Sequence, residues 1–121
     1  MAESSIFTSW GIPVPGRETK GLELFQEVVG FWIKQKAAGV IEDFRVGLAT
    51  QGNYDALSGY LVVEGSKKAI SEALESAEFR SQITRALHIV QNLSTVRCDT
   101  GTAIPGRIEE IVTARKQLGI I

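Results

Sequence analysis

The sequence holds a single histidine, His88, and this residue is the one best suited to acid–base chemistry. An imidazole changes its charge near neutral pH, so in a cavity His88 could act as a general base on a phenol or an α-carbon. The alternative is a histidine at a strand end that is exposed or hydrogen-bonded to the backbone. Asn92 follows on the same face of the same predicted strand and could place an amide beside the imidazole.

Two aromatic residues could line the same cavity. Trp10 ends the first predicted strand and shares a face with Ile6 and Thr8. Tyr60 shares a face with Val62, and its hydroxyl needs a partner if it is buried. An aromatic wall with one imidazole, one amide and one phenol suits a planar, apolar ligand that carries a few oxygens. Ordinary packing is the competing interpretation of both aromatic residues.

The sequence shows no ligand set for a metal and no motif for a cofactor. It has one histidine and one cysteine, and no two carboxylates stand at metal-like spacing from them. His88 alone could be an axial haem ligand, but it lacks supporting residues. Cys98 follows Arg97 in a strand, so the two side chains point to opposite faces and we expect an inert thiol. We therefore expect neither a metal nor a cofactor.

Composition and charge restrict the partners. The formal net charge is −1, from 13 Lys and Arg against 14 Asp and Glu, which argues against nucleic-acid binding. The longest hydrophobic run, residues 28–33, is too short to cross a bilayer. The first ten residues lack the basic start and long apolar run of a signal peptide. With one cysteine, the chain is expected in the cytoplasm and away from membranes.

These side chains need a framework, and apolar periodicity predicts one. Four strands are predicted, at residues 5–10, 40–50, 58–65 and 88–98. Helices are predicted at residues 17–38, 67–74 and 76–87, and a final helix carries Ile108, Ile111, Val112 and Leu118. The order β-α-β-β-α-β predicts an α+β, ferredoxin-like fold, in which two helices cover one face of an antiparallel four-stranded sheet. We expect a single domain, 1–121, with a core at 5–98 and an appended loop and helix at 99–121.

The phrase Pro-Gly-Arg occurs twice, at residues 15–17 and 105–107, with acidic residues after it. Proline suits the first turn of a helix, and acidic groups suit the positive end of its dipole. The phrase is therefore expected to start two helices. An anion site at these helix starts, with Arg17 or Arg107, is the alternative. The stiff loop at 11–16 also fixes where the indole of Trp10 points.

The sheet face that the helices leave uncovered is expected to be semi-apolar. Tyr60 and Val62 lie on one face of the third strand, and in the second strand Gly47 is mixed with Asp43 and Arg45. A sheet face of this kind needs a cover. A second copy related by a two-fold axis is the economical cover, and the final helix is the alternative. We expect a homodimer.

The element order, the chain length and the segment EFRSQITRALHIVQNLSTV (78–96) resemble the dimeric α/β-barrel superfamily. The segments FTSWGIPVPGRE (7–18) and LSGYLVVEG (57–65) resemble one of its uncharacterised bacterial single-domain families. The resemblance covers residues 5–98. It implies two ferredoxin-like subunits packed sheet to sheet around a cavity. Members include cofactor-free monooxygenases, lactone isomerases, polyketide cyclases, haem-degrading enzymes, dye-type peroxidases and ligand-sensing domains, so the fold does not select one activity.

Two functions remain in view. The first is cofactor-free proton transfer or oxygenation of an aromatic or polyketide-like compound, with His88 as the base and Trp10, Tyr60 and Asn92 shaping the pocket. The second is a non-catalytic module for ligand binding or assembly. Cyclases and isomerases of the superfamily often use a histidine, but His88 matches none of theirs by motif. The resemblance therefore assigns no role to His88.

Overall fold

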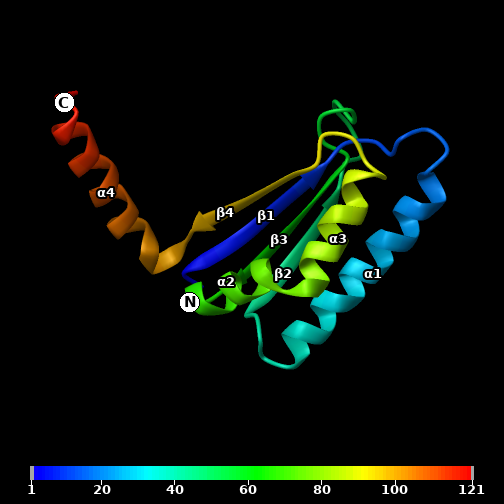
Figure 1. Cartoon of the computed structure of the whole chain (residues 1–121), viewed down its shortest axis with the longest axis horizontal. Coiled ribbons are helices and arrows are strands. Elements are labelled where there is room, and N and C mark those ends of the chain that lie inside the picture. Colours follow the sequence, from blue (N-terminus) through cyan, green and yellow to red (C-terminus); the bar gives the residue numbers. More distant parts are fainter. Residues whose placement is uncertain (1, 121) are drawn as a thin grey trace.

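The computed structural model describes residues 2–120, and its elements follow the predicted order (Figure 1). Met1 and Ile121, the two ends of the predicted domain, lie outside the described residues. The strands are β1 (Ser4–Trp10), β2 (Asp43–Leu48), β3 (Gly59–Gly65) and β4 (Ser94–Asp99). The helices are α1 (Glu18–Ala37), α2 (Lys67–Glu75), α3 (Ala77–Leu87) and α4 (Ile104–Gln117), with a short 3-10 turn, η1 (Gly101–Ala103), before α4.

The four strands form one antiparallel sheet in the order β2-β3-β1-β4, which confirms the predicted ferredoxin-like fold. In β1, Thr8 lies opposite Leu61 on one side and Thr95 on the other. Residues directly opposite each other share a face, so Ile6, Thr8 and Trp10 face the same way as Leu61. Helices α1, α2 and α3 cover this face, which we call the covered face (Figure 1).

The hydrophobic core lies between the covered face and the helices. Its buried members are Ile6, Trp32, Ile41, Leu61, Val63, Ile70 and Phe79. Two serines shape the helical layer: the Ser66 hydroxyl accepts a hydrogen bond from the Ala69 N–H, and that of Ser76 accepts one from the Phe79 N–H. These hydrogen bonds begin α2 and α3, as serine caps do. The local sequence therefore explains why the chain breaks at Ser76 and restarts.

The fourth strand is shorter than the predicted range of 88–98, and the prediction was wrong at its start. β4 begins at Ser94, and His88 is the C-terminal cap of α3, with φ −91° and ψ −7°. The segment 89–93 pairs with the loop after β1: the Val14 N–H donates to the Ile89 carbonyl (2.8 Å). Its apolar residues Ile89, Val90 and Leu93 line a space between the sheet and the helices, and Val90 makes only an isolated bridge, with Pro13. The apolar run that resembled a strand is therefore a connecting segment.

The final helix starts at the second Pro-Gly-Arg, as predicted, but it does not serve as a cover for the sheet. α4 begins at Ile104 and includes Pro105 in its first turn, so the second Pro-Gly-Arg lies within the helix start. Every residue of α4 is exposed, and the helix projects from the sheet end beyond β4 (Figure 1). Within one subunit it does not cover the sheet. None of the described helices is both long and apolar enough to cross a membrane.

Candidate functional site

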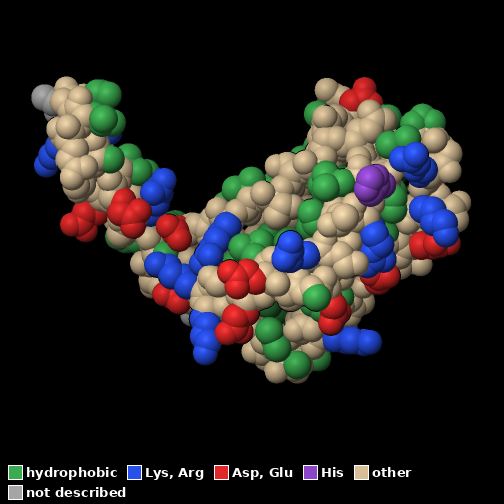
Figure 2. Space-filling view, viewed as in Figure 1, with side chains coloured by type: hydrophobic (Ala, Val, Ile, Leu, Met, Phe, Trp, Pro, Cys, Tyr) green, Lys and Arg blue, Asp and Glu red, His purple; other side chains and the backbone are tan. Residues whose placement is uncertain are grey.

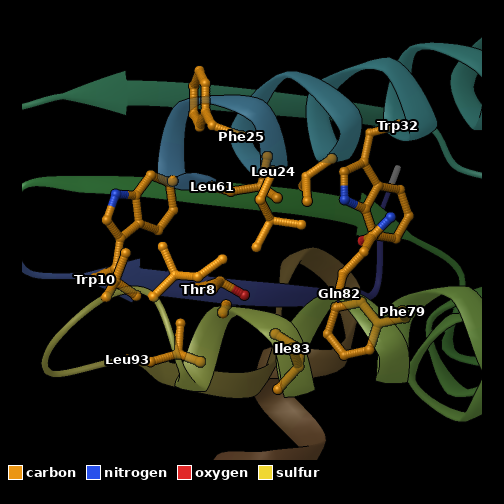
Figure 3. A pocket seen from close by; sticks show the side chains of 15 residues that line it. Thr8, Trp10, Leu24, Phe25, Trp32, Leu61, Phe79, Gln82, Ile83 and Leu93 are labelled. Atoms are coloured by element: carbon orange, nitrogen blue, oxygen red, sulfur yellow. The ribbon is translucent and has the colours of Figure 1, made fainter. Parts of the chain in front are cut away.

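A pocket of about 90 Å³ opens between the covered face of the sheet and the helices α1 and α3 (Figure 3). Its lining is almost wholly apolar. The lining residues are Thr8, Trp10, Gly21, Leu24, Phe25, Val28, Trp32, Leu61, Phe79, Gln82, Ile83, Ala86, Ile89, Val90 and Leu93. Residues of β1 and β3 form the floor of the pocket, and residues of α1 and α3 form its walls. The segment after α3 closes one end. An apolar cavity with few polar groups is the usual form of a small-molecule site.

Small and shortened side chains help to leave this space open. Gly21 of α1 faces Ile89, and a Cβ at Gly21 would lie 3.3 Å from the Ile89 methyl Cγ2. Thr8 stands on the floor, where the core positions Ile6 and Leu61 are larger. Its hydroxyl is hydrogen-bonded to that of Thr95 (3.3 Å), so this buried polar group is satisfied.

The two ends of the pocket have different characters. At the outer end, the half-buried rings of Trp10 and Phe25 meet at a tilt of 59°, with centroids 6.0 Å apart. At the inner end, Trp32, Phe79 and Gln82 are all buried. Figure 3 shows Trp10 and Trp32 at opposite ends, with the Trp32 indole nitrogen facing the space between them. The Trp32 Nε1 is fully buried and has no hydrogen-bond partner among residues 2–120.

Backbone contacts around Gly11 hold Trp10 at the outer end. The Trp10 carbonyl accepts a hydrogen bond from the Ser58 N–H (2.6 Å), and the Gly11 N–H donates to the Gln91 carbonyl (2.7 Å). A Cβ at Gly11 would lie 2.1 Å from the carbonyl oxygen of Asp55. Three segments therefore meet at a point that only glycine fits, and their meeting fixes the indole of Trp10.

Charged groups stand outside the pocket. Across the α1–α3 groove, Arg85 makes two hydrogen bonds with the Glu27 carboxylate, one of them Nη1 to Oε1 at 3.0 Å. This contact lowers the pKa of the Glu27 carboxyl, chiefly through the hydrogen bonds and secondarily through charge. Among the lining residues that the structure describes, none carries a titratable side chain. Within residues 2–120, no three His, Cys, Asp or Glu side chains gather closely enough to hold a metal ion.

Of the four predicted site residues, the structure places only Trp10 in this pocket. Tyr60 pairs with Ser9 in the sheet and lies on the opposite face, where its ring stacks on Phe7 at a centroid distance of 6.0 Å. A Cβ at Gly47 would lie 2.2 Å from the Tyr60 ring, so the ring lies directly over this glycine. Placing the indole and the phenol in one cavity was therefore wrong, because they occupy opposite faces of the sheet.

His88 and Asn92 are both exposed and lie outside the pocket lining (Figure 2, histidine in purple). The His88 carbonyl accepts a hydrogen bond from Nη1 of Arg17 at 2.5 Å, which ties the end of α3 to the start of α1. The Asn92 amide nitrogen donates to the Asp55 carbonyl (2.6 Å), and Asn92 has a positive φ of 53°. No strand carries the two side chains on one face, so the predicted amide–imidazole pair does not form. The catalytic role of His88 stays a prediction.

Sequence reasoning missed the two polar groups at the inner end, Trp32 and Gln82. Both carried a signal. Trp32 lies in the apolar stripe of α1, where a buried indole N–H needs an acceptor. Gln82 lies three residues after Phe79 and one before Ile83, so it interrupts the apolar stripe of α3.

Comparison with known proteins identifies the fold. No protein-family model matches the sequence, and a search of curated proteins finds no match. Among solved structures, a dimeric ferredoxin-like protein of unknown function from Bacteroides fragilis is 11% identical, with a TM-score of 0.61 over 83% of this chain and 98% of that chain. A putative antibiotic biosynthesis monooxygenase from Deinococcus radiodurans is 14% identical, with a TM-score of 0.58 over 83% of this chain and 93% of that chain. SnoaB, a cofactor-independent oxygenase from Streptomyces nogalater, is 15% identical, with a TM-score of 0.52 over 87% of this chain and 99% of that chain.

Proposed function

We propose that this ferredoxin-like chain is a ligand-binding module whose pocket holds one small, mainly apolar ring. The observation that carries this proposal is the apolar cavity between the sheet and the helices α1 and α3, which is also lined by the segment after α3. Its volume of about 90 Å³ is far below that of sites for drug-sized molecules, which begin at about 300 Å³. A single ring matches this space better than a fused polyketide.

The alternative is cofactor-free proton transfer or oxygenation, and the similarity in fold to SnoaB favours it. Proton transfer needs a base within hydrogen-bond reach of the bound molecule. None of the described lining residues is titratable, and His88 is exposed outside the lining. The geometry therefore favours binding over catalysis, and fold alone does not reverse that preference.

We also propose that two copies of the chain pack through the uncovered face of the sheet. Phe7, Tyr60, Val62 and Val96 form an apolar patch on this face, where Val96 is 48% exposed and Tyr60 36%. Arg45 and Glu64 make an ion pair beside the patch. An apolar centre with a charged border is the pattern of a subunit interface. The neighbour from Bacteroides fragilis is described as dimeric, which supports the proposal.

Filling the pocket tests the binding proposal. Ala86 of α3 lines the cavity, so the ring of an Ala86→Phe variant should occupy it. Titration with toluene, followed by NMR shifts of the Leu24 and Ile83 methyl groups, should detect binding to the unmodified protein. The variant should bind at least about tenfold more weakly, a loss of about 1.4 kcal/mol, since toluene would have to displace the ring that fills the space.

Leu87→Phe provides the matched control for this experiment. Leu87 is the next residue of α3 and is 61% exposed, so the same ring enters solvent instead of the pocket. Toluene should bind this variant as it binds the unmodified protein. If toluene shifts no pocket methyl group in the unmodified protein, or binds all three proteins alike, the proposal is wrong.

Removing the imidazole separates binding from catalysis. A His88→Ala variant should keep its fold and its affinity for toluene, because the hydrogen bonds that His88 makes within residues 2–120 are made by its backbone N–H and carbonyl. We expect the midpoint of thermal unfolding to change by less than about 2 °C, as is usual for exposed positions. If this variant loses a turnover that the unmodified protein displays, His88 is a catalytic base after all.

A further inference from the structure

The inner end of the pocket holds a hydrogen-bond donor that nothing in the described chain uses. Trp32 is only 1% exposed, and its Nε1 has no partner. A buried N–H without an acceptor costs free energy, so native structures rarely leave one unpaired. In Figure 3 this nitrogen is on the side of the indole that faces the pocket. An orphaned donor in that position indicates that its acceptor comes from a bound molecule.

A second polar group stands beside it. Gln82 of α3 is 5% exposed, and its carboxamide makes no hydrogen bond within residues 2–120. In Figure 3 its side chain reaches towards the indole ring of Trp32. The third polar side chain of the lining, Thr8, is already hydrogen-bonded to Thr95. The free hydrogen-bonding capacity of the pocket is therefore concentrated at one end, on two residues from two helices.

We propose that this inner end recognises a neutral carbonyl oxygen, so that the ligand is a small ketone or aldehyde with an apolar ring. An indole N–H can only donate, which requires an acceptor on the ligand. A carbonyl oxygen has two lone pairs, so it can accept from Trp32 Nε1 and from the amide nitrogen of Gln82 together. This inference rests on the proposed binding function.

The lack of a cation at this end of the pocket indicates that the ligand oxygen is neutral. A carboxylate buried at this end would need a cation, because the cost of removing an ion from water is large. No Lys or Arg is among the described lining residues, and the Arg85 guanidinium is engaged by Glu27 outside the pocket. A hydroxyl is a poorer match, because it would also have to place its own proton on the Gln82 amide oxygen, whereas a carbonyl oxygen is satisfied by the indole donor alone. A ketone or aldehyde introduces neither a charge nor an additional donor.

Two probes of nearly equal shape isolate this contact. Acetophenone carries a carbonyl oxygen where α-methylstyrene carries a methylene group, and the rest of each molecule is the same. We expect the unmodified protein to bind acetophenone about tenfold more tightly, which is the effect of one well-placed hydrogen bond in a buried site. In ¹H–¹⁵N NMR spectra, acetophenone should also move the Trp32 indole proton downfield, and α-methylstyrene should not.

Trp32→Phe keeps an aromatic ring and removes the donor. In this variant the preference for acetophenone should fall to about one, while α-methylstyrene still binds and shows that the pocket remains. Tyr54→Phe is the control, because it also removes a hydrogen-bond donor from an aromatic side chain, but one that is 42% exposed and lies outside the pocket lining. That variant should keep the tenfold preference.

The outcomes separate this inference from the binding function on which it rests. If the unmodified protein binds both probes equally, or if Trp32→Phe keeps the preference, the carbonyl site is wrong and the binding module stands. If neither the two probes nor toluene bind, the binding function itself fails and the carbonyl site fails with it.

Discussion

Replacing Gly11 with alanine is expected to lower the free energy of unfolding by about 3 kcal/mol, near the upper end of the range for overpacked positions. Gly11 is buried, and its new Cβ would lie 2.1 Å from the Asp55 carbonyl oxygen and 3.0 Å from that of Gln91. Both contacts are with backbone, which cannot rotate away as a side chain can. Circular dichroism during heating should show the unfolding midpoint lowered by roughly 10 °C.

Gly30→Ala is the matched control for this substitution. Gly30 lies inside α1, and apart from its chain neighbours and the backbone of its own helix no atom lies within 4 Å of the position that its Cβ would take. Alanine is preferred over glycine in a helix interior, so this variant should be more stable by up to about 1 kcal/mol.

Gly11→Ala should also displace the indole of Trp10 and weaken toluene binding. An unchanged midpoint for Gly11→Ala would contradict the close approach of the three segments.

Introducing a charge at Val62 is expected to convert the proposed dimer into monomers. Val62 lies on the uncovered face of β3, opposite Phe7 in the adjacent strand. In a two-fold interface, Val62→Asp places two carboxylates in the contact. Arg45, opposite Val62 in β2, is already paired with Glu64, so each added buried charge costs about 3 kcal/mol. The sum corresponds to a roughly 10⁴-fold weaker association. Sedimentation velocity at micromolar concentrations should show a dimer for the unmodified protein and a monomer for the variant.

Val40→Asp tests whether the effect is specific to the face. Val40 lies between α1 and β2, outside the sheet, and is 46% exposed. The same charge at this position should leave the dimer intact, and the circular dichroism spectra of both variants should match that of the unmodified protein. A monomeric unmodified protein, or a Val62→Asp variant that remains dimeric, would show that the uncovered face is not the interface.

Most of the fold could be predicted from the sequence, because the signals for its elements are local. The helical spacing of Val28 and Trp32 predicts an apolar side of α1 that does pack against the core, although Leu22 and Ile33 of the same predicted stripe are exposed. The serines at 66 and 76 cap α2 and α3 through hydrogen bonds that span only three residues. Alternation along β3 separates Tyr60 from Leu61 in every ferredoxin-like arrangement. Each of these features depends on neighbours within one or two turns of chain.

The site was harder to predict, because it depends on strand register and on contacts between distant segments. Alternation tells which residues share a face within one strand, but it does not relate the faces of two strands. Ser9 pairs with Tyr60, so Tyr60 shares the face of Ser9 and lies opposite to its neighbour Trp10. The apolar residues after His88 satisfy a strand pattern equally well when they line a pocket. The predicted strand was too long for that reason, and His88 and Asn92 were placed together.

The sequence by itself determined the element order, the helix starts and the two kinds of sheet face, since periodicity and capping act over a few residues. Only the tertiary structure decided where the cavity lies and which polar groups it holds. The Trp32 indole and the Gln82 amide are fifty positions apart along the chain, and folding places both at one buried end. Whether a buried donor is paired depends on every segment around it, and no local pattern contains that information.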